Sequence, residues 1–377
     1  MRSAAFLFLL LGLTGIWVTS QEAPKPERLL ADVLLLETPE QLKVVAAQTS
    51  LIHSTSAGQS QVNMHSYLIY FDGRFWASWS SGPVNSEDSP SQFVRYSTSR
   101  DGHHWDESQI LVADPDGPDK PGRWLARGIF VQEGKLHALC VYLEGNSIGP
   151  PPVEWSSLRL VRFEWSGNRW VNRGTYLENC MNNYPPQMLN GRLLMTCRDG
   201  NMRVHTALLG SGRWMVTALS GEPPHDKMSE PSWYADPHGV AHMIFRDGRR
   251  SNYLYRSISR DDGKTWSAPV RTNYPDAGSK NVTGRLSNGW YYLINNPSPR
   301  GRDPLAISFS RDGWTFERSL ALRRGATEIR SPRRGKNPGF QYPQALERTG
   351  ALWVIYCVNQ EDVEISEFNI SDFGLER

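Results

Sequence analysis

The side chains best suited to chemistry stand in four short stretches of the second half of the chain. These are Glu230 in SEPSWY, Arg246 in MIFRDG, Arg302 in SPRGRDP and Tyr342 in FQYPQ. Planar guanidinium groups bind a carboxylate in a two-pronged way that a lysine ammonium cannot copy. Tyrosine is a poor nucleophile until a neighbouring carboxylate takes its proton. Because a neutral phenol is not repelled by a negative carboxylate, this set suits attack at a carbon beside a carboxylate.

One phrase occurs three times and gives these residues a common frame. It reads SRDGHHW from Ser99, SRDDGKTW from Ser259 and SRDGWTF from Ser310. Serine and aspartate side chains can bond the backbone N–H groups of a tight turn, glycine can adopt a positive φ, and the closing aromatic can wedge between sheets. We therefore expect each phrase to form a turn between the third and fourth strands of a repeating unit. The aspartates of the phrase are then structural: Asp101, Asp261 and Asp312.

The stretches between these phrases read as β-hairpins. HSYLIYF and RFWASWSS flank an Asp-Gly pair, which is the strongest local signal for a tight hairpin turn. Similar units begin near residues 62, 124, 182, 229, 279 and 340. Repeats of about 40–65 residues, each with three or four strands, are typical of β-propellers. We predict an all-β fold, a six-bladed β-propeller of four-stranded antiparallel blades.

The N-terminal part divides into two segments. Residues 1–20 contain one arginine, an apolar run and small residues, which is the layout of a secretory signal peptide, with a membrane anchor as the alternative. Residues 21–61 include a strand-like stretch that would complete the last blade and close the ring, or build a seventh blade. Residues 62–377 form the propeller. Because no later stretch is apolar enough to cross a bilayer, we expect a protein that is secreted or periplasmic.

Charge and cysteine content limit the partners. The 41 basic and 39 acidic residues are spread without blocks, which argues against a nucleic-acid partner and against a polybasic membrane patch. No set of residues has the spacing of a metal site, and no cofactor is implied. The four cysteines allow three pairings, and buried free thiols fit the sequence as well. The basic run from Arg323 to Gly339 is either a solvated connection or a rim that attracts an anionic polysaccharide.

The repeated phrase resembles the Asp-box of sialidases and related BNR-repeat propellers, and the copy at Ser259 matches it in full. The order of Glu230, two arginines before Asp-boxes and Tyr342 also resembles the sialidase active site. The resemblance implies that Arg246 and Arg302 are the second and third members of the arginine triad that grips a sugar carboxylate. It implies Tyr342 as the nucleophile, Glu230 as the group that activates it, and a position for the Asp-boxes away from the active site.

The first repeat extends the resemblance and also departs from it. Glu87 and Asp88 precede the first Asp-box, where sialidases keep an aspartate acid/base, so Asp88 is the candidate and Glu87 stands beside it. The first arginine of the triad should open this repeat, yet VNMHSYLIYF has His65 in its place. Arg127 in WLARGIF and Arg198 in LMTCRDG hold comparable positions in the next two repeats. Either can supply the missing guanidinium, although surface salt bridges would explain both residues equally well.

Three functions fit these residues. The order of the four residues in the second half favours an exo-acting, sialidase-like glycoside hydrolase on an acidic, carboxylate-bearing glycan. His65 favours a second function, because a neutral imidazole paired with Tyr342 can remove the C5 proton of a uronate, as in propeller polysaccharide lyases. The third is a non-catalytic propeller that binds an anionic glycan. A hydrogen-bonded His65 on an inner strand is the structural alternative to its catalytic role.

Overall fold

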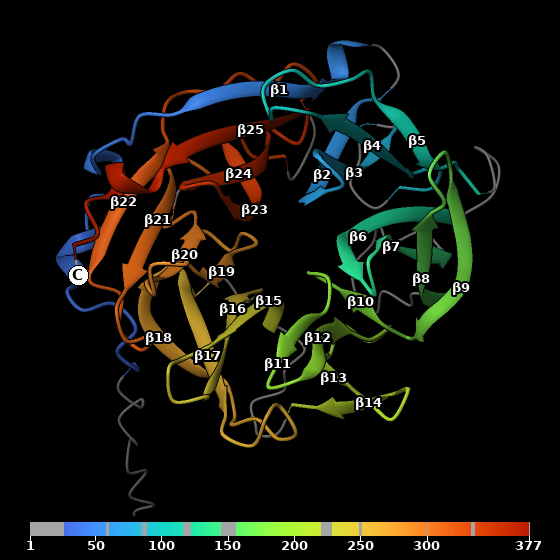
Figure 1. Ribbon diagram of the computed structural model, residues 1–377. Helices are drawn as coiled ribbons and strands as arrows, with labels where there is room; N and C mark the ends of the chain where they lie inside the picture. Colours follow the sequence, from blue (N-terminus) through green and yellow to red (C-terminus); the bar gives the residue numbers. More distant parts are fainter. Residues whose placement is uncertain are drawn as a thin grey trace, which may run out of the picture.

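The computed structural model of the chain describes residues 26–57, 60–83, 85, 89–115, 122–144, 156–219, 228–248, 251–299, 301–332 and 336–376. The predicted signal peptide and the acidic pair Glu87 and Asp88 lie outside these residues. Six antiparallel sheets surround a central axis, which confirms the predicted six-bladed β-propeller (Figure 1). The helices in the described ranges are short 3-10 turns, and none is long or apolar enough to cross a membrane.

The first three blades follow one another along the chain. Blade one consists of β2 (Val62–Phe71), β3 (Arg74–Gly82), β4 (Phe93–Ser99) and β5 (Gln109–Val112). Blade two consists of β6 (Gly122–Gln132), β7 (Lys135–Glu144), β8 (Ser156–Trp165) and β9 (Trp170–Glu178). Blade three consists of β10 (Met181–Asn182), β11 (Gln187–Leu189), β12 (Arg192–Arg198), β13 (Val204–Gly210) and β14 (Arg213–Ala218). Its innermost strand is split, because β10 and β11 both pair with β12.

The last three blades repeat the plan. Blade four consists of β15 (Met228–Ala235), β16 (Ala241–Asp247), β17 (Tyr253–Ser259) and β18 (Val270–Pro275). Blade five consists of β19 (Val282–Arg285), β20 (Tyr291–Asn295), β21 (Leu305–Ser310) and β22 (Arg318–Arg323). Blade six consists of β23 (Phe340–Arg348), β24 (Ala351–Val358), β25 (Asp362–Asn369) and β1 (Gln48–Ser54). All eight residues of β24 are buried, since its apolar sequence ALWVIYCV has both faces covered.

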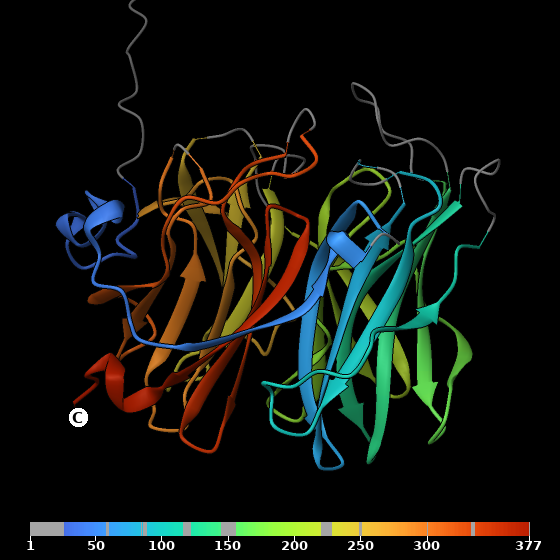
Figure 2. The same cartoon turned by 90° about the horizontal axis from the view of Figure 1, so that it is seen from above.

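Both ends of the chain build the sixth blade. β1 pairs with the edge of β25, so a strand from the N-terminal region completes the blade that ends the chain. Before β1 the chain runs along the outer strands of blades four and five, where Glu27 forms a bridge to Thr272 of blade four, and Leu30 and Val44 form bridges to Phe316 and Ala321 of blade five. Figure 2 shows this segment crossing the side of the ring. The described N-terminal residues thus link three blades and add one strand to blade six rather than a seventh blade.

The Asp-boxes form turns between the third and fourth strands, as predicted. In the first box, Ser99 Oγ accepts the N–H of Gly102 at 2.8 Å, and Asp101 Oδ1 accepts two backbone N–H groups, both at 2.8 Å. Gly102 has φ of +82°, and a Cβ atom there would lie 2.3 Å from the ring of Trp353 in blade six. Ser99 pairs with Phe75 beside the β2–β3 turn, so this box lies at the rim opposite the start of β2.

One disulfide crosses blade three. It joins Cys180, just before β10, to Cys197 on β12, while Cys140 and Cys357 are buried free thiols. The sequence left the pairing open, because the register that selects it depends on the split inner strand. Asn182 stands opposite Cys197 in that register, which brings Cys180 within reach.

Candidate active site

Four inner strands contain a β-bulge, and each bulge carries one residue that the sequence singled out. These residues are His65 on β2, Arg127 on β6, Glu230 on β15 and Tyr342 on β23. A bulge inserts an extra residue and re-aims side chains, which is why bulges are common beside active sites. His65, Glu230 and Tyr342 have φ of 54°, 48° and 57°. This conformation is uncommon outside glycine, and its recurrence in three blades marks a site imposed by the fold.

The arginines of blades two and three meet at a buried thioether. Arg127 Nη2 lies 3.0 Å and Arg198 Nη2 lies 3.5 Å from Sδ of Met181, the residue that begins the split inner strand. Arg198 Nη1 also donates a hydrogen bond to Ser229 Oγ at 3.0 Å, next to Glu230 in the chain. These contacts connect blade two to blade four through blade three.

An ion pair within blade four continues this series of contacts. Arg246 Nη1 lies 2.9 Å from Glu230 Oε2 and also donates to the carbonyl of Gly278 at 3.1 Å. The next residue, Ser279, accepts a hydrogen bond from Arg302 of blade five. Burial opposes ionisation of Glu230, but Arg246 and neighbouring basic groups outweigh it and hold the pKa of this carboxyl below its usual value. Glu230 is therefore ionised at neutral pH.

The series closes at Tyr342 in blade six. Arg302 Cζ lies 5.9 Å from the centroid of the Tyr342 ring. The imidazole of His65 meets the same ring edge-on, with centroids 5.0 Å apart and an interplanar angle of 60°. Burial, together with the charge of Arg127, holds the pKa of His65 well below its usual value, so the imidazole is neutral at pH 7. Its Nδ1 atom has no hydrogen-bond partner in the described part of the chain. A neutral imidazole beside a phenol can accept a proton.

The sequence analysis missed two residues of this centre, Lys280 and Asp276. The side chain of Lys280 is buried, with Nζ 3.1 Å from the hydroxyl oxygen of Tyr67 and 4.5 and 4.2 Å from the ring centroids of Tyr67 and Tyr184. Burial lowers the pKa of Lys280 to about 7, although the charge of Glu230 opposes this shift. The sequence did contain a signal for Lys280. This residue stands just before the inner strand β19, and the predicted site residues of other blades, such as His65 and Tyr342, also lie at inner strands.

A second buried carboxyl lies near two of the arginines. Asp276 accepts the N–H of Gly278 at 2.9 Å and a hydrogen bond from Asn295 at 3.3 Å. Burial raises the pKa of Asp276 to about 7, while the charges of Arg246 and Arg302 act in the opposite direction. This carboxyl therefore changes its protonation state near neutral pH.

The structure brings together every predicted site residue that it describes, with at least one from each blade. The residues are His65, Arg127, Arg198, Glu230, Arg246, Arg302 and Tyr342. The predicted acid Asp88 and its neighbour Glu87 lie outside the described residues. Within the described ranges, no group of three or more histidine, cysteine, aspartate or glutamate residues could hold a metal ion. Four basic side chains, Arg127, Arg198, Arg246 and Lys280, act on the ionised Glu230, and such a field favours an anionic ligand.

Residues 73–355 match the family model of the BNR repeat-like domain. The chain belongs to this family. None of the curated protein sequences matches the BNR repeat-like chain significantly. The matched range runs from the β2–β3 turn to β24 and includes strands of all six blades, while β1, β2 and β25 lie outside it.

Solved structures share the fold at low sequence identity. A sialidase is 21% identical with a TM-score of 0.62, over 87% of this chain and 33% of its own. The Hadza microbial sialidase Hz136 is 16% identical with a TM-score of 0.64, over 86% and 69% of the two chains. A Trypanosoma rangeli sialidase in complex with sialic acid is 15% identical with a TM-score of 0.60, over 93% and 60%. The BNR repeat-like chain thus has a sialidase-like propeller fold and spans about a third of the length of the first of these proteins.

A fourth structure is of similar size to this chain. It is a protein of unknown function from Dyadobacter fermentans, 15% identical with a TM-score of 0.64, over 86% of this chain and 98% of its own. At these identities the likeness concerns the fold, and the chemistry of the BNR repeat-like chain has to be argued from its own side chains.

Proposed function

We propose that this protein is a secreted, exo-acting glycoside hydrolase of sialidase type that acts on a carboxylate-bearing glycan. The observation that carries the proposal is the ion pair of Glu230 with Arg246, set among further guanidinium groups and linked through Arg302 to Tyr342. The basic groups suit an anionic sugar, and the ionised glutamate and the phenol suit nucleophilic catalysis. Similar folds in sialidases, one of them in complex with sialic acid, support the same class of substrate.

The proposed reaction proceeds in two displacements. The phenol oxygen of Tyr342 forms a bond to the anomeric carbon while Glu230 takes the phenol proton, and the bond to the leaving oxygen breaks. Asp88 is the proposed acid that protonates the leaving oxygen. Water then attacks the anomeric carbon and gives a proton to Asp88, while the bond from that carbon to Tyr342 breaks and the phenol oxygen recovers its proton from Glu230. Arg246 and Arg302 hold the sugar carboxylate during both steps.

His65 shapes the proposed substrate class. A sialidase triad has an arginine at this place, and a neutral imidazole cannot make the same charge-assisted contact. Binding of the sugar carboxylate therefore depends more on the other guanidinium groups, among them Arg127 and Arg198. We therefore propose an acidic sugar in general as the substrate rather than sialic acid in particular.

A screen of acidic glycans tests this function. Sialosides and uronate-capped polysaccharides are incubated with the protein, and released sugar and ultraviolet absorbance are both recorded. We expect free sugar without new absorbance, and no release by the Tyr342→Phe variant. Activity that survives this substitution would exclude Tyr342 as the nucleophile, and binding without release would identify a glycan-binding propeller.

The contact between His65 and Tyr342 favours a second candidate function. In an eliminase the neutral imidazole and the phenol transfer the C5 proton of a uronate, and the arginines neutralise its carboxylate. The bond to the leaving oxygen breaks as a C4–C5 double bond forms. The unsaturated product absorbs in the ultraviolet, so the same screen separates elimination from hydrolysis.

A further inference from the structure

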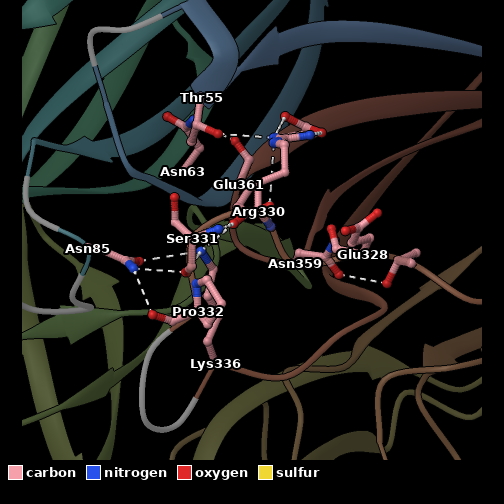
Figure 3. A network of polar contacts seen from close by, with 12 residues as sticks. Thr55, Asn63, Asn85, Glu328, Arg330, Ser331, Pro332, Lys336, Asn359 and Glu361 are labelled. Atoms are coloured by element: carbon pink, nitrogen blue, oxygen red, sulfur yellow. Dashed lines mark hydrogen bonds and ion pairs between the residues drawn. The ribbon is translucent and has the colours of Figure 1, made fainter.

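A turn of the sixth blade reaches the seam with blade one (Figure 3). Asn359 and Gln360 join β24 to β25 with φ of 58° and 59°, the pair of positive values that a type I′ hairpin turn requires. The next residue is Glu361, whose carboxylate Oε1 lies 2.7 Å from the Nζ atom of Lys336, and neither side chain is exposed. A buried ion pair of this kind is favourable only when further hydrogen bonds satisfy its atoms.

The connection between blades five and six supplies those hydrogen bonds. The Glu361 carboxylate accepts the backbone N–H groups of Ser331 at 2.8 Å and Arg330 at 3.1 Å. The Arg330 guanidinium makes a two-pronged pair with Asp362, at 2.6 and 2.9 Å. In its described part, this basic connection therefore has Arg330 and Lys336 paired with acidic residues of blade six. That arrangement favours a fastened connection over a rim that binds an anionic polysaccharide.

Glu361 also fastens the inner strand of blade one. Its carbonyl oxygen accepts hydrogen bonds from Asn63 Nδ2 at 2.8 Å and from the N–H of Thr55 at 3.3 Å. Asn63 Oδ1 accepts in turn from Ser81 Oγ at 2.6 Å, which ties it to the second strand of the blade. Asn63 stands two residues before His65, so this contact holds β2 directly beside its bulge.

Lys336 reaches the connection that follows β3. Its Nζ atom lies 3.4 Å from Asn85 Oδ1, and Asn85 Nδ2 donates to the carbonyl of Ser331 at 2.8 Å (Figure 3). The ammonium thus joins blade one to the same network from a second direction.

The turn holds the start of β23 as well. Asn359 Oδ1 accepts the N–H of Gly339 at 2.9 Å, and the N–H of Asn359 donates to the carbonyl of Gly339 at 2.9 Å. Tyr342 follows Gly339 by three residues. One turn therefore contacts both strands that carry the His65–Tyr342 pair, each within three residues of the pair.

We propose that Glu361, held by Lys336, is a positioning residue that sets the distance between Tyr342 and His65 across the seam. This proposal rests on the proposed function, in which Tyr342 reacts. Neither Glu361 nor Lys336 touches the reacting groups. They act through Asn63 on the strand of His65, while the neighbouring Asn359 acts through Gly339 on the strand of Tyr342.

Kinetics on the full-length protein test the proposal with Lys336→Met. We expect kcat on the glycan found in the screen to fall by about tenfold or more, while KM changes less, because misplaced reacting groups slow the chemical step. Lys336→Arg keeps the charge and should recover part of the loss. The matched control is Glu364→Gln on β25, which removes the ion pair of Glu364 with Arg323 of β22, at 2.9 Å, and should leave kcat unchanged.

Hydrogen exchange gives a readout that does not require activity. In Lys336→Met we expect faster exchange of the amides in residues 62–67 and 339–342, with no change in β12 of blade three. Unchanged exchange at these strands, or equal acceleration in all blades, would overturn the positioning role, as would a wild-type kcat in this variant. A wild-type protein that hydrolyses no glycan would instead contradict the proposed function, and the exchange result would still decide the positioning role.

Discussion

The imidazole of His65 meets the phenol ring of Tyr342 edge-on, with 5.0 Å between the ring centroids. The two residues belong to the first and last blades, so their contact spans the seam between blade six and blade one. Both occupy bulges with positive φ, which means that the backbone of each strand imposes the approach. This pair is the point at which the proposed hydrolase and the proposed eliminase differ.

The role of His65 can be measured with His65→Asn, which keeps a polar side chain but removes the base. In the hydrolase, His65 carries no proton in the reaction, so we expect kcat/KM for sugar release to fall by less than about tenfold. A general base contributes about 10²–10⁴-fold, and a loss of that size would identify the eliminase. Steady-state kinetics on the glycan found in the screen decide between the two.

Substitution of Arg127 tests whether this guanidinium contributes to the binding of the anionic glycan. Its guanidinium is buried at the centre, with Nη2 3.0 Å from Met181 Sδ, and its charge acts on both His65 and Glu230. We expect Arg127→Met to raise KM by about 10- to 100-fold, the size of a lost charge-assisted hydrogen bond, with a smaller effect on kcat. The control is Arg159→Met in the same blade, where the guanidinium stacks on Tyr142 at 4.2 Å. An equal rise of KM in both variants would contradict a specific role for Arg127.

The blades and the set of residues that gather at their centre could be predicted from the sequence, but the individual contacts among those residues could not. Asp-Gly and Asn-Gly turns and the Asp-box act locally, and each recurs with the period of a blade, so the ring follows from short stretches. The contact of His65 with Tyr342 depends on bulges, which exist only in the pairing of one strand with its neighbour. Lys280 escaped notice for a related reason, since its partners Tyr67 and Tyr184 come from two other blades.

Gly102 of the first Asp-box allows blade one to pack closely against Trp353 of blade six, and the stability that this packing contributes can be measured. A Cβ atom at Gly102 would lie 2.3 Å from Trp353, whereas one at Gly134, in the β6–β7 turn, would meet nothing within 4 Å. Both glycines have positive φ, at 82° and 72°, so both alanine variants carry the same backbone cost. We expect Gly102→Ala to lower the free energy of unfolding by about 1–3 kcal/mol more than Gly134→Ala, through overpacking. Urea denaturation measures the difference, and equal losses would contradict the packing role.

The N-terminal segment should stabilise the ring through Leu30. This side chain is fully buried and its residue bridges Phe316, while Leu34 of the same segment is 64% exposed. We expect Leu30→Ala to lower the free energy of unfolding by about 2–5 kcal/mol and Leu34→Ala by less than about 0.5 kcal/mol. Thermal unfolding of both variants checks this. Equal melting temperatures would mean that the segment contributes no stability at Leu30.

The buried ammonium of Lys280 should make stability depend on pH in alkaline solution. Its pKa is about 7 in the folded protein, against an ordinary value of 10.5. Between these values the unfolded chain binds a proton that the folded protein has released, so the free energy of unfolding rises as the pH increases from 7. Below pH 7 both states are protonated, and this residue contributes no slope.

Lys280→Met removes that slope while keeping an apolar side chain between Tyr67 and Tyr184. Compared with the variant, the wild-type protein should gain about 3 kcal/mol of stability between about pH 7 and about pH 9.5, since each unit of separation in pKa is worth about 1.4 kcal/mol. Urea unfolding of both proteins at matched pH isolates this residue, because every other titrating group is common to the pair. A stability difference that stays constant over this range would show that Lys280 remains protonated in the folded protein. The ion-pairing effect of Glu230 would then outweigh burial at the centre of the propeller.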